Sequence, residues 1–162
     1  MSIPSQRPSL TPIHRIQVPK GPRLSVTSLE TAGLDHDSYD VVISLVDPGT
    51  VLEWSHPRHY LFFVEDCVDE VQGAPDAAFL QALLEIDLAA ADRVLIHCHG
   101  GYSRSPAAAM LLAWRLGARI GAIEKGINWR RAYPNRRILE LGEALLATGG
   151  TLMTLAVRKA QG

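Results

Sequence analysis

The sequence predicts an α/β domain built on a central, twisted, mostly parallel sheet of about four or five strands, with helices on both faces. Short runs of apolar and β-branched residues alternate with longer helix-forming runs, which is the order expected when strands lead into helices. The runs at residues 41–46 and 94–96 contain almost no polar positions, as is typical of parallel strands buried on both faces. A chain of 162 residues, 47% hydrophobic and 20% charged, is long enough to bury one core of ordinary size.

The N-terminal part of the chain divides into a tail and a pair of short strands. Residues 1–12 are rich in proline and serine and show no hydrophobic periodicity, so we expect a flexible tail there. Residues 13–162 are then expected to form a single domain. Within it, residues 13–18 and 24–28 are candidate strands, and Lys20-Gly21-Pro22 between them favours a turn.

Two further strands are predicted before the middle of the chain. The apolar run at residues 41–46 ends at Asp47-Pro48-Gly49, a sequence that favours a turn. A similar run at residues 60–64 stops at Glu65 and Asp66. Both runs are expected to be buried on both faces of the sheet.

The predicted helices begin with one at residues 75–91. Pro75 suits the first turn of that helix, and Asp76 lies favourably near the positive end of the helix dipole. The helix opened by Pro106 is apolar nearly all round, so it is expected to be central in the domain.

Two more amphipathic helices are predicted in the last third of the chain. Ile120 and Ile123 line one face of the first, which breaks before Pro134 because the residue preceding a proline disfavours the helical conformation. The second is expected to end at Gly149-Gly150. Residues 151–162 either extend that helix or fray.

Composition and charge exclude several classes of partner. The formal net charge of −1 gives no polybasic surface for nucleic acid or for an anionic membrane. No apolar run reaches the length of a membrane span, and the N-terminal residues lack the apolar segment of a secretory signal. Since the two cysteines come without such a signal, a cytoplasmic location is expected. The oligomeric state is not indicated by the sequence.

The segment between the strand at residues 94–96 and the helix opened by Pro106 carries the reactive side chains. Five residues separate Cys98 from Arg104, with Gly101 midway, so the loop is short and turns its backbone N–H groups inward at a helix N-terminus. Such a loop forms an anion site, and the Arg104 guanidinium can bind two phosphate oxygens. The reactive thiolate form of Cys98 is favoured in the same surroundings. A nucleophile beneath a phosphate site indicates phosphoryl transfer through a phosphocysteine.

These residues also carry a resemblance to a known family. The run His97-Cys98-His99-Gly100-Gly101-Tyr102-Ser103-Arg104-Ser105 fits every fixed position of the catalytic loop of Cys-based protein tyrosine phosphatases. Over residues 41–147 the chain resembles the small, single-domain, dual-specificity type, particularly its bacterial branch. The resemblance implies a dual-specificity-phosphatase-like catalytic domain that uses no metal and no cofactor. It also implies a phosphorylated protein or a small phosphomonoester as the substrate.

The resemblance assigns roles within the loop. Cys98 would be the nucleophile, and Arg104 would bind phosphate. The hydroxyl of Ser105 would hydrogen-bond the sulfur and help it to leave in the second step, although a serine here also suits a helix N-cap. His97 would be held by backbone hydrogen bonds and would tune the cysteine. The other phosphate-binding positions are His99, Gly100, Gly101, Tyr102 and Ser103.

A general acid must protonate the leaving oxygen of the substrate. Asp66 follows the predicted strand at residues 60–64 and precedes Cys98 by about the separation usual in the family, so it is the first candidate. Asp69 and Glu65 are alternatives, because a neighbouring carboxyl group could occupy the same space.

The segment that opens the last long helix resembles the Pro-Asn segment of dual-specificity phosphatases. In the family this segment packs near the catalytic loop, which makes Asn135 an orienting residue. Four arginines of like charge cluster around it, namely Arg130, Arg131, Arg136 and Arg137. The cluster is either a solvated helix face or a second anion site beside the catalytic pocket, with Arg130 favoured by its spacing before Pro134.

Several alternatives remain open at this point. Cys67, next to the candidate acid, is either a small packed residue or a thiol that traps oxidised Cys98 as a disulfide. A phosphoinositide or inositol-phosphate phosphatase is less favoured, because the free positions of the loop carry no lysine. A catalytically inactive phosphate-binding module would not need the nucleophile, arginine and hydroxyl that are all present, and the spacing fits a sulfurtransferase poorly. No spacing of histidine and cysteine matches a common zinc site.

Overall fold

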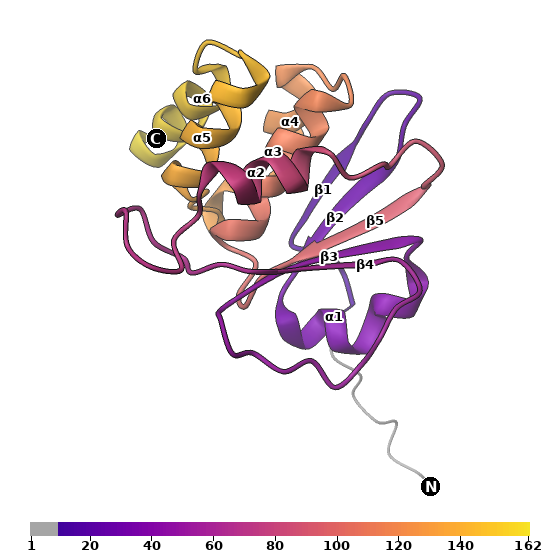
Figure 1. Cartoon of the computed structure of the whole chain (residues 1–162). Helices are drawn as coiled ribbons and strands as arrows, with labels where there is room; N and C mark the ends of the chain where they lie inside the picture. The colour runs from indigo at the N-terminus through magenta and orange to yellow at the C-terminus, as the bar shows by residue number, and fades with distance from the viewer. Residues whose placement is uncertain (1–9) are drawn as a thin grey trace, which may run out of the picture.

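The computed structural model describes residues 10–162, which form an α/β structure around a five-stranded sheet (Figure 1). The tail expected at residues 1–12 lies mostly outside the described residues, and residues 10–12 belong to no helix or strand. The strand order is β1-β2-β5-β3-β4; β1 is antiparallel to β2, and the other pairs are parallel. The mostly parallel sheet is therefore confirmed. Its strands are β1 (His14–Gln17), β2 (Arg23–Thr27), β3 (Val41–Val46), β4 (His59–Phe63) and β5 (Arg93–His97).

Helices cover both faces of the sheet, as predicted. Figure 1 shows α1 on one face and the helices α2 to α6 on the opposite face. The α-helices are α1 (Leu29–Asp35), α2 (Ala77–Leu84), α3 (Arg104–Arg115), α4 (Ile120–Gly126), α5 (Arg136–Leu146) and α6 (Thr151–Gln161). Two 3₁₀ turns, η1 (His36–Ser38) and η2 (Trp129–Arg131), follow α1 and α4.

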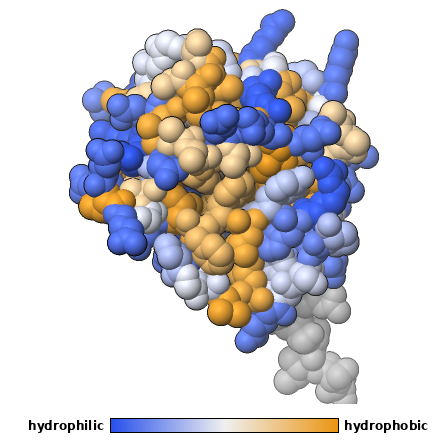
Figure 2. All heavy atoms as spheres, in the orientation of Figure 1, coloured by the Kyte–Doolittle hydropathy of each residue, from blue (hydrophilic) through white to orange (hydrophobic). Residues whose placement is uncertain are grey.

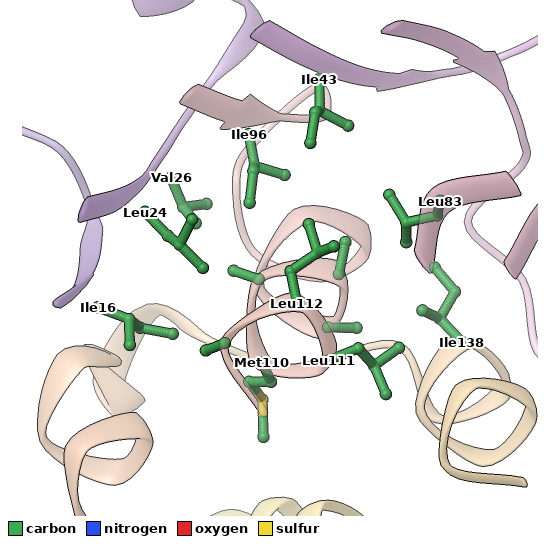
Figure 3. Packing of buried hydrophobic residues seen from close by; sticks show 14 of the residues in the cluster. Ile16, Leu24, Val26, Ile43, Leu83, Ile96, Met110, Leu111, Leu112 and Ile138 are labelled. Carbon is green, nitrogen blue, oxygen red and sulfur yellow. The ribbon is translucent and has the colours of Figure 1, made fainter. Parts of the chain in front are cut away.

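The larger core lies between the sheet and α3. Residues 104–113 of this helix are all buried, which confirms the prediction that it is central. Figure 3 shows Ile96 of β5 and Ile138 of α5 on two different sides of α3. The helix α5 can approach closely because Gly142 has no side chain, and a Cβ atom there would overlap the side chain of Leu111.

The strand β4 is an edge strand, which corrects the prediction that it is buried on both faces. It pairs only with β3, and Leu61 and Phe63 are 40% and 51% exposed. Tyr60 and Phe62 point to the other face, where Phe62 meets Phe79 of α2 at 5.3 Å between ring centroids. The prediction failed because apolar residues fill both faces of the strand, whereas a helix covers only one. Apolar side chains also show among polar ones across the face in Figure 2, as is usual for a folded domain.

The helix α2 ends well before residue 91, where the sequence pattern placed its end. Asp76 is its N-cap, so Pro75 precedes the first turn instead of lying in it. After the helix, the side chain of Asp87 accepts a hydrogen bond from the N–H group of Ala89 (3.0 Å). Such a hydrogen bond from the backbone to a nearby side chain competes with the helix, so the chain leaves the helix although the apolar periodicity of the sequence continues towards residue 91.

The last two helices are separate, and α5 ends before the predicted stop at Gly149-Gly150. Ala147 follows it in the left-handed conformation (φ 54°). The buried carboxylate of Glu143 then accepts hydrogen bonds from the N–H groups of Leu152 (2.6 Å) and Met153 (3.0 Å). A carboxylate complements the positive end of a helix dipole, so a residue of α5 stabilises the start of α6.

The sequence analysis did not predict α1. Ser28, which the strand pattern included, is the N-cap of this helix and accepts a hydrogen bond from the N–H group of Thr31 (3.2 Å). Ala32 packs against Val42 and Leu95 and forms a second, smaller core on this face of the sheet. His97 of the loop motif points to this face as well, where its Nε2 atom lies 2.6 Å from Ser44 Oγ.

Candidate active site

The loop that joins β5 to α3 has the predicted strand–loop–helix setting. Gly101 in its centre has a positive φ of 81°, a conformation that residues with a side chain rarely adopt. A Cβ atom at this position would also lie 2.7 Å from Ile13 and 3.0 Å from the carbonyl oxygen of Thr27. The glycine therefore allows the loop to turn tightly against β2.

The carbonyl groups of the loop are held by hydrogen bonds to the elements around it. The four donors come from three parts of the fold: one from β1, one from the start of α1 and two from the segment before α5. The bonds run from His14 Nε2 to Gly101 O (3.1 Å), Leu29 N to His99 O (2.9 Å), Tyr133 N to Tyr102 O (2.7 Å) and Asn135 N to Ser103 O (3.0 Å).

This arrangement determines where the N–H groups of the loop point. The described residues contain no cis peptide bond, and in a trans peptide the C=O group and the following N–H group point in opposite directions. The N–H groups of Gly100, Tyr102, Ser103 and Arg104 therefore face the interior of the loop. Backbone N–H groups therefore gather at the N-terminus of α3, an arrangement that suits an anion.

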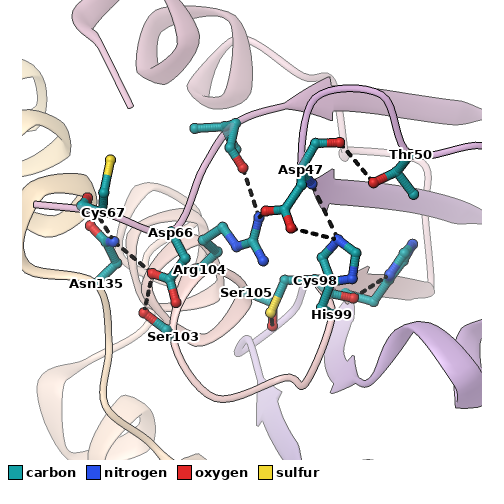
Figure 4. A network of polar contacts seen from close by, with 12 residues as sticks. Asp47, Thr50, Asp66, Cys67, Cys98, His99, Ser103, Arg104, Ser105 and Asn135 are labelled. Carbon is teal, nitrogen blue, oxygen red and sulfur yellow. Dashed lines mark hydrogen bonds and ion pairs between the residues drawn. The ribbon is translucent and has the colours of Figure 1, made fainter. Parts of the chain in front are cut away.

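Cys98 lies at the base of this ring and is 3% exposed. Its sulfur lies 3.0 Å from the hydroxyl oxygen of Ser105, and the N–H group of Gly101 donates to it at 3.3 Å (Figure 4). Both groups can donate to a sulfur that carries negative charge. Ser105 lies inside α3 and contacts the sulfur, whereas Ser103 is the N-cap of the helix and makes no side-chain capping bond.

Arg104 approaches the site from the first turn of α3 and is 5% exposed. Its Nη1 group donates to Asp47 Oδ1 and to the carbonyl oxygen of Val64, both at 2.7 Å (Figure 4). Its Nε–H group is buried and has no acceptor among the described residues. A buried donor without an acceptor costs roughly 1–3 kcal/mol, so an anion bound at this position would supply a missing partner.

The sequence analysis assigned Asp47 only to a turn, yet this residue belongs to the site. It pairs with Arg104, and its N–H group donates to Nε2 of His99 at 3.2 Å. His99 is thereby turned towards Asp47, on the rim of the loop (Figure 4). A signal was present in the sequence: Asp47 follows β3 as Cys98 follows β5, and the carboxyl ends of neighbouring parallel strands meet at one edge of a sheet.

Of the three candidate acids, all within the described residues, Asp66 is the one whose carboxylate contacts the catalytic loop. Its Oδ1 atom accepts hydrogen bonds from the Ser103 hydroxyl (2.7 Å) and from Nδ2 of Asn135 (2.9 Å). Glu65 instead lies beside Gly73, and the carbonyl group of Asp69 faces the thiol of Cys67.

Asn135 links the loop to α5 and to the segment that carries the acid. Its Oδ1 atom caps α5 by accepting from the N–H group of Ile138 (2.9 Å). Its Nδ2 group donates to Asp66 and to the carbonyl oxygen of Cys67 (3.1 Å). The orienting role expected for Asn135 is therefore matched by contacts to the acid and, through its N–H group, to the loop.

Arg130 and Arg131 point to different places, so the predicted arginine cluster divides. Arg131 lies 5.5 Å from the centre of the Tyr102 ring and donates to its hydroxyl oxygen at 3.3 Å. It lines a pocket of about 390 Å³ beside the catalytic loop. Arg130 lines a groove of about 650 Å³ together with Arg158 and Lys159 of α6.

Two buried histidines hold carbonyl groups of the loop and are neutral in the folded protein. His97 Nδ1 lies 3.0 Å from the carbonyl oxygen of Cys98, and burial lowers the pKa of His97 to about 4. His14 contacts Gly101 on the other side, and burial lowers its pKa to about 4 as well. In His14 the Nδ1 atom accepts from the N–H group of Asn128 (2.9 Å), a bond that protonation of that nitrogen would break.

The stability of the protein should therefore decrease in mild acid. An unfolded histidine binds a proton near pH 6.5, whereas His14 and His97 do so in the folded state only near pH 4. Their contribution is complete above pH 6.5 and is lost as the pH falls towards 4, by up to about 3 kcal/mol for each histidine. Urea unfolding at pH 7.0 and pH 4.5 measures this loss, and a free energy of unfolding that is equal at both values would contradict it.

Among residues 10–162, no group of three or more His, Cys, Asp or Glu side chains is placed to hold a metal ion. The two cysteines are both free, and the thiol of Cys67 is turned towards the carbonyl group of Asp69 (3.8 Å), away from Cys98 (Figure 4). Among the described residues, Cys67 is half-buried and forms no disulfide with Cys98. None of the helices that the structure describes has the length and apolar character needed to cross a membrane.

Comparison with known proteins gives a consistent result for the fold. No protein-family model matches the chain, and no curated protein matches it in sequence. Among solved structures, the Yvh1 phosphatase domain from Chaetomium thermophilum is similar, with 20% identity and a TM-score of 0.55 over 84% of this chain and 96% of that one. Human tyrosine phosphatase-like serine/threonine/tyrosine-interacting protein shares 14% identity, with a TM-score of 0.56 over 83% and 97% of the two chains.

A third similar structure is the PTP-2 phosphatase of Cydia pomonella, with 20% identity and a TM-score of 0.57 over 82% of this chain and 89% of that one. The strand order, the helices on both faces and these similarities agree with the sequence-based expectation for the architecture. The chain has the fold of the small, dual-specificity-like proteins of the Cys-based protein tyrosine phosphatase superfamily.

Proposed function

We propose that the chain is a metal-independent phosphomonoester hydrolase, a protein tyrosine or dual-specificity phosphatase that works through a phosphocysteine. One observation carries the proposal: the sulfur of Cys98 lies at the base of a ring of inward-facing N–H groups, beside the buried guanidinium of Arg104. This is the arrangement needed to attack a bound phosphate group and to stabilise the charge on its oxygens.

In the first step, the sulfur of Cys98 attacks phosphorus, an S–P bond forms and the bond to the leaving oxygen breaks. The N–H groups of the loop and Arg104 hold the other phosphate oxygens. Asp66 gives its proton to the leaving oxygen. In the second step, Asp66 takes a proton from the attacking water, the S–P bond breaks, and Ser105 donates a hydrogen bond to the departing sulfur (Ser105 Oγ lies 3.0 Å from it).

The fixed position of Asp66 supports its role as the acid. Ser103 and Asn135 both bond its Oδ1 atom, while Oδ2 has no hydrogen-bond partner among residues 10–162 and can carry the proton. In the Asp66→Asn variant, kcat for poor leaving groups should fall on the order of a hundredfold or more, because an amide cannot protonate the leaving oxygen. The loss should be smaller for an activated aryl phosphate, whose leaving group needs less protonation.

A matched control separates this role from a general effect of charge in the same segment. Asp69 is three residues away, and among the described residues its carboxylate makes no hydrogen bond to the catalytic loop. Asp69→Asn should keep the activity and the pH–rate profile of the wild type. If Asp69→Asn loses the acid-dependent limb of that profile and Asp66→Asn keeps it, the assignment of the acid is wrong.

We also propose a second anion subsite at Arg130, the residue that the spacing before Pro134 favours. Its groove contains Arg158 and Lys159, and Glu124 pairs with both of these. Among the described residues, no ion pair compensates the charge that Arg130 adds. Arg130→Ala should raise KM severalfold for a doubly phosphorylated peptide and leave a simple aryl phosphate unchanged. Equal effects on both substrates, or an effect only in Arg131→Ala, would refute this assignment.

The substrate class is tested by one assay across three kinds of phosphate ester. Phosphotyrosine peptides, phosphothreonine peptides and phosphoinositides are each incubated with the protein, with Cys98→Ser as the control. We expect turnover of phosphotyrosine, alone or together with phosphothreonine. Turnover of phosphoinositides only would favour the lipid-phosphate alternative. Binding of phosphopeptides without turnover would favour an inactive binding module.

A further inference from the structure

A chain of hydrogen bonds crosses the α1 side of the sheet and ends at the peptide of Cys98. His59 Nε2 lies 2.7 Å from Ser44 Oγ, and Ser44 Oγ lies 2.6 Å from His97 Nε2. His97 Nδ1 in turn lies 3.0 Å from the carbonyl oxygen of Cys98. The three side chains come from the neighbouring strands β4, β3 and β5, and Ser44 lies directly opposite His97 in the register.

The chemistry of these groups fixes the direction of every bond in the chain. A carbonyl oxygen only accepts, so His97 Nδ1 must carry the hydrogen that it donates to Cys98. Burial lowers the pKa of His97 to about 4, so the ring is neutral at pH 7 and its Nε2 atom can only accept. The single hydrogen of Ser44 therefore points to His97. Ser44 must then accept from His59, whose hydrogen lies on Nε2.

The outer end of this chain is held by ring stacking. Trp54 stacks on His59 with 5.0 Å between ring centroids, and on its other partner, His36, at 4.3 Å. The same indole ring lies 5.8 Å from the ring of His97. Ser44 and His97 are fully buried, so water does not offer either of them a replacement partner.

We propose that Ser44 and His59 are positioning residues for the catalytic loop, because together they select the tautomer of His97 that holds the carbonyl group of Cys98. That carbonyl group belongs to the peptide whose N–H group is on His99. With the carbonyl fixed towards His97, the N–H group of His99 points the opposite way, towards the anion site. The hydroxyl of Ser44 thus orients the N–H group of His99 indirectly, through its hydrogen bond to His97 and the hydrogen bond from His97 to the carbonyl oxygen of Cys98.

Removing the Ser44 hydroxyl should release this tautomer. When the Ser44 hydroxyl no longer donates to Nε2, the ring of His97 can carry its hydrogen on Nε2 instead of Nδ1. In that tautomer, Nδ1 presents a lone pair to the carbonyl oxygen of Cys98. Two acceptors that face each other repel, so the peptide of Cys98 loses its fixed orientation. The consequence for activity rests on the proposed phosphatase function, whereas the tautomer and the reactivity of the thiol do not.

The test compares Ser44→Ala with Ser25→Ala, a change at a buried serine on β2 that has no recorded contact with His97 or Cys98. Proton–nitrogen correlation spectra report which ring nitrogen of His97 carries the hydrogen. The rate of alkylation of Cys98 by iodoacetamide as a function of pH reports its thiolate form. Ser44→Ala should mix the two tautomers of His97 and move the alkylation profile to higher pH. Ser25→Ala should leave both unchanged.

Turnover of para-nitrophenyl phosphate should fall by roughly tenfold to a hundredfold in Ser44→Ala, by analogy with the loss seen when the hydrogen-bond partner of a metal-bound histidine is removed. His59→Gln keeps an N–H group near the position of Nε2, whereas His59→Leu removes it. The glutamine variant should therefore retain more activity than the leucine variant.

Three outcomes would overturn the proposal. The first is a single, unchanged Nδ1–H tautomer of His97 in Ser44→Ala, together with an unchanged alkylation profile. The second is an equal response in Ser25→Ala, which would indicate a general effect of buried serines. The third is equal activity of the two His59 variants. If the protein hydrolyses no phosphate ester at all, the spectra and the alkylation rates still decide the role of Ser44.

Discussion

The Cys98→Ser variant is expected to lose turnover by roughly four orders of magnitude or more, with its fold intact. A serine hydroxyl is protonated at neutral pH, and the N–H group of Gly101 and the hydroxyl of Ser105 cannot supply the missing negative charge. The shape of the loop does not depend on the sulfur, because hydrogen bonds from surrounding elements hold its carbonyl groups. Binding of a phosphotyrosine peptide should therefore survive.

Two measurements on the same preparation check this expectation. Release of phosphate from the peptide gives the rate, and isothermal titration with the same peptide gives the affinity. Cys67→Ser is the matched control, because Cys67 is the second free cysteine and its thiol faces Asp69 instead of the loop. Turnover near the wild-type rate in Cys98→Ser would refute nucleophilic catalysis by this residue. Loss of turnover in Cys67→Ser as well would indicate a role for both thiols.

The Arg104→Lys variant is expected to lose about a thousandfold in kcat although it keeps the positive charge. The guanidinium of Arg104 holds Asp47 and the carbonyl oxygen of Val64 with one nitrogen, and its buried Nε–H group remains for a phosphate oxygen. A lysine has one ammonium group for these three acceptors, so it cannot hold two carbonyl or carboxylate oxygens and a phosphate in the same geometry.

Arg115→Lys provides the control for this change. Arg115 is the last residue of the same helix, at the end away from the loop, and it donates to the carbonyl oxygen of Ile86. Steady-state kinetics of both variants with an aryl phosphate should show the loss only in Arg104→Lys. If Arg104→Lys keeps more than a tenth of the wild-type kcat, the requirement for the guanidinium group of Arg104 in binding phosphate is wrong.

The sequence was sufficient to predict the architecture where each element carries its own signal. The runs at residues 41–46 and 94–96, in β3 and β5, are almost entirely apolar, and α3 is apolar nearly all round because its residues 104–113 are buried. The edge position of β4 could not be predicted in this way, because Leu61 and Phe63 look like core residues in the sequence and only the strand order exposes them. The helix α1 is short, and its start at Ser28 follows β2 without a break that the pattern could reveal.

The same distinction applies to the candidate site. The spacing of Cys98, Arg104 and Ser105 is local, so the sequence was sufficient to place them together in the loop and the first turn of the helix that follows it. The contact of Asp66 with that loop agrees with the expected order of the acid and the cysteine along the chain. Contacts between distant segments leave no such local spacing, although the place of Asp47 directly after β3, the neighbour of β5, could have indicated its contact with the loop. His14 reaches Gly101 across 87 positions, and Asp47 reaches Arg104 across 57.

The central claim is that the reaction passes through a phosphoryl group bound to the sulfur of Cys98. The most direct measurement is to mix the protein with para-nitrophenyl phosphate, stop the reaction rapidly in acid and locate the phosphoryl group by mass analysis of peptides. The account predicts a phosphorylated peptide modified at Cys98 in the wild type and more of it in Asp66→Asn, where water is activated more slowly. A phosphoryl group on a different residue, or continued turnover with no phosphorylated peptide at any reaction time, would contradict it.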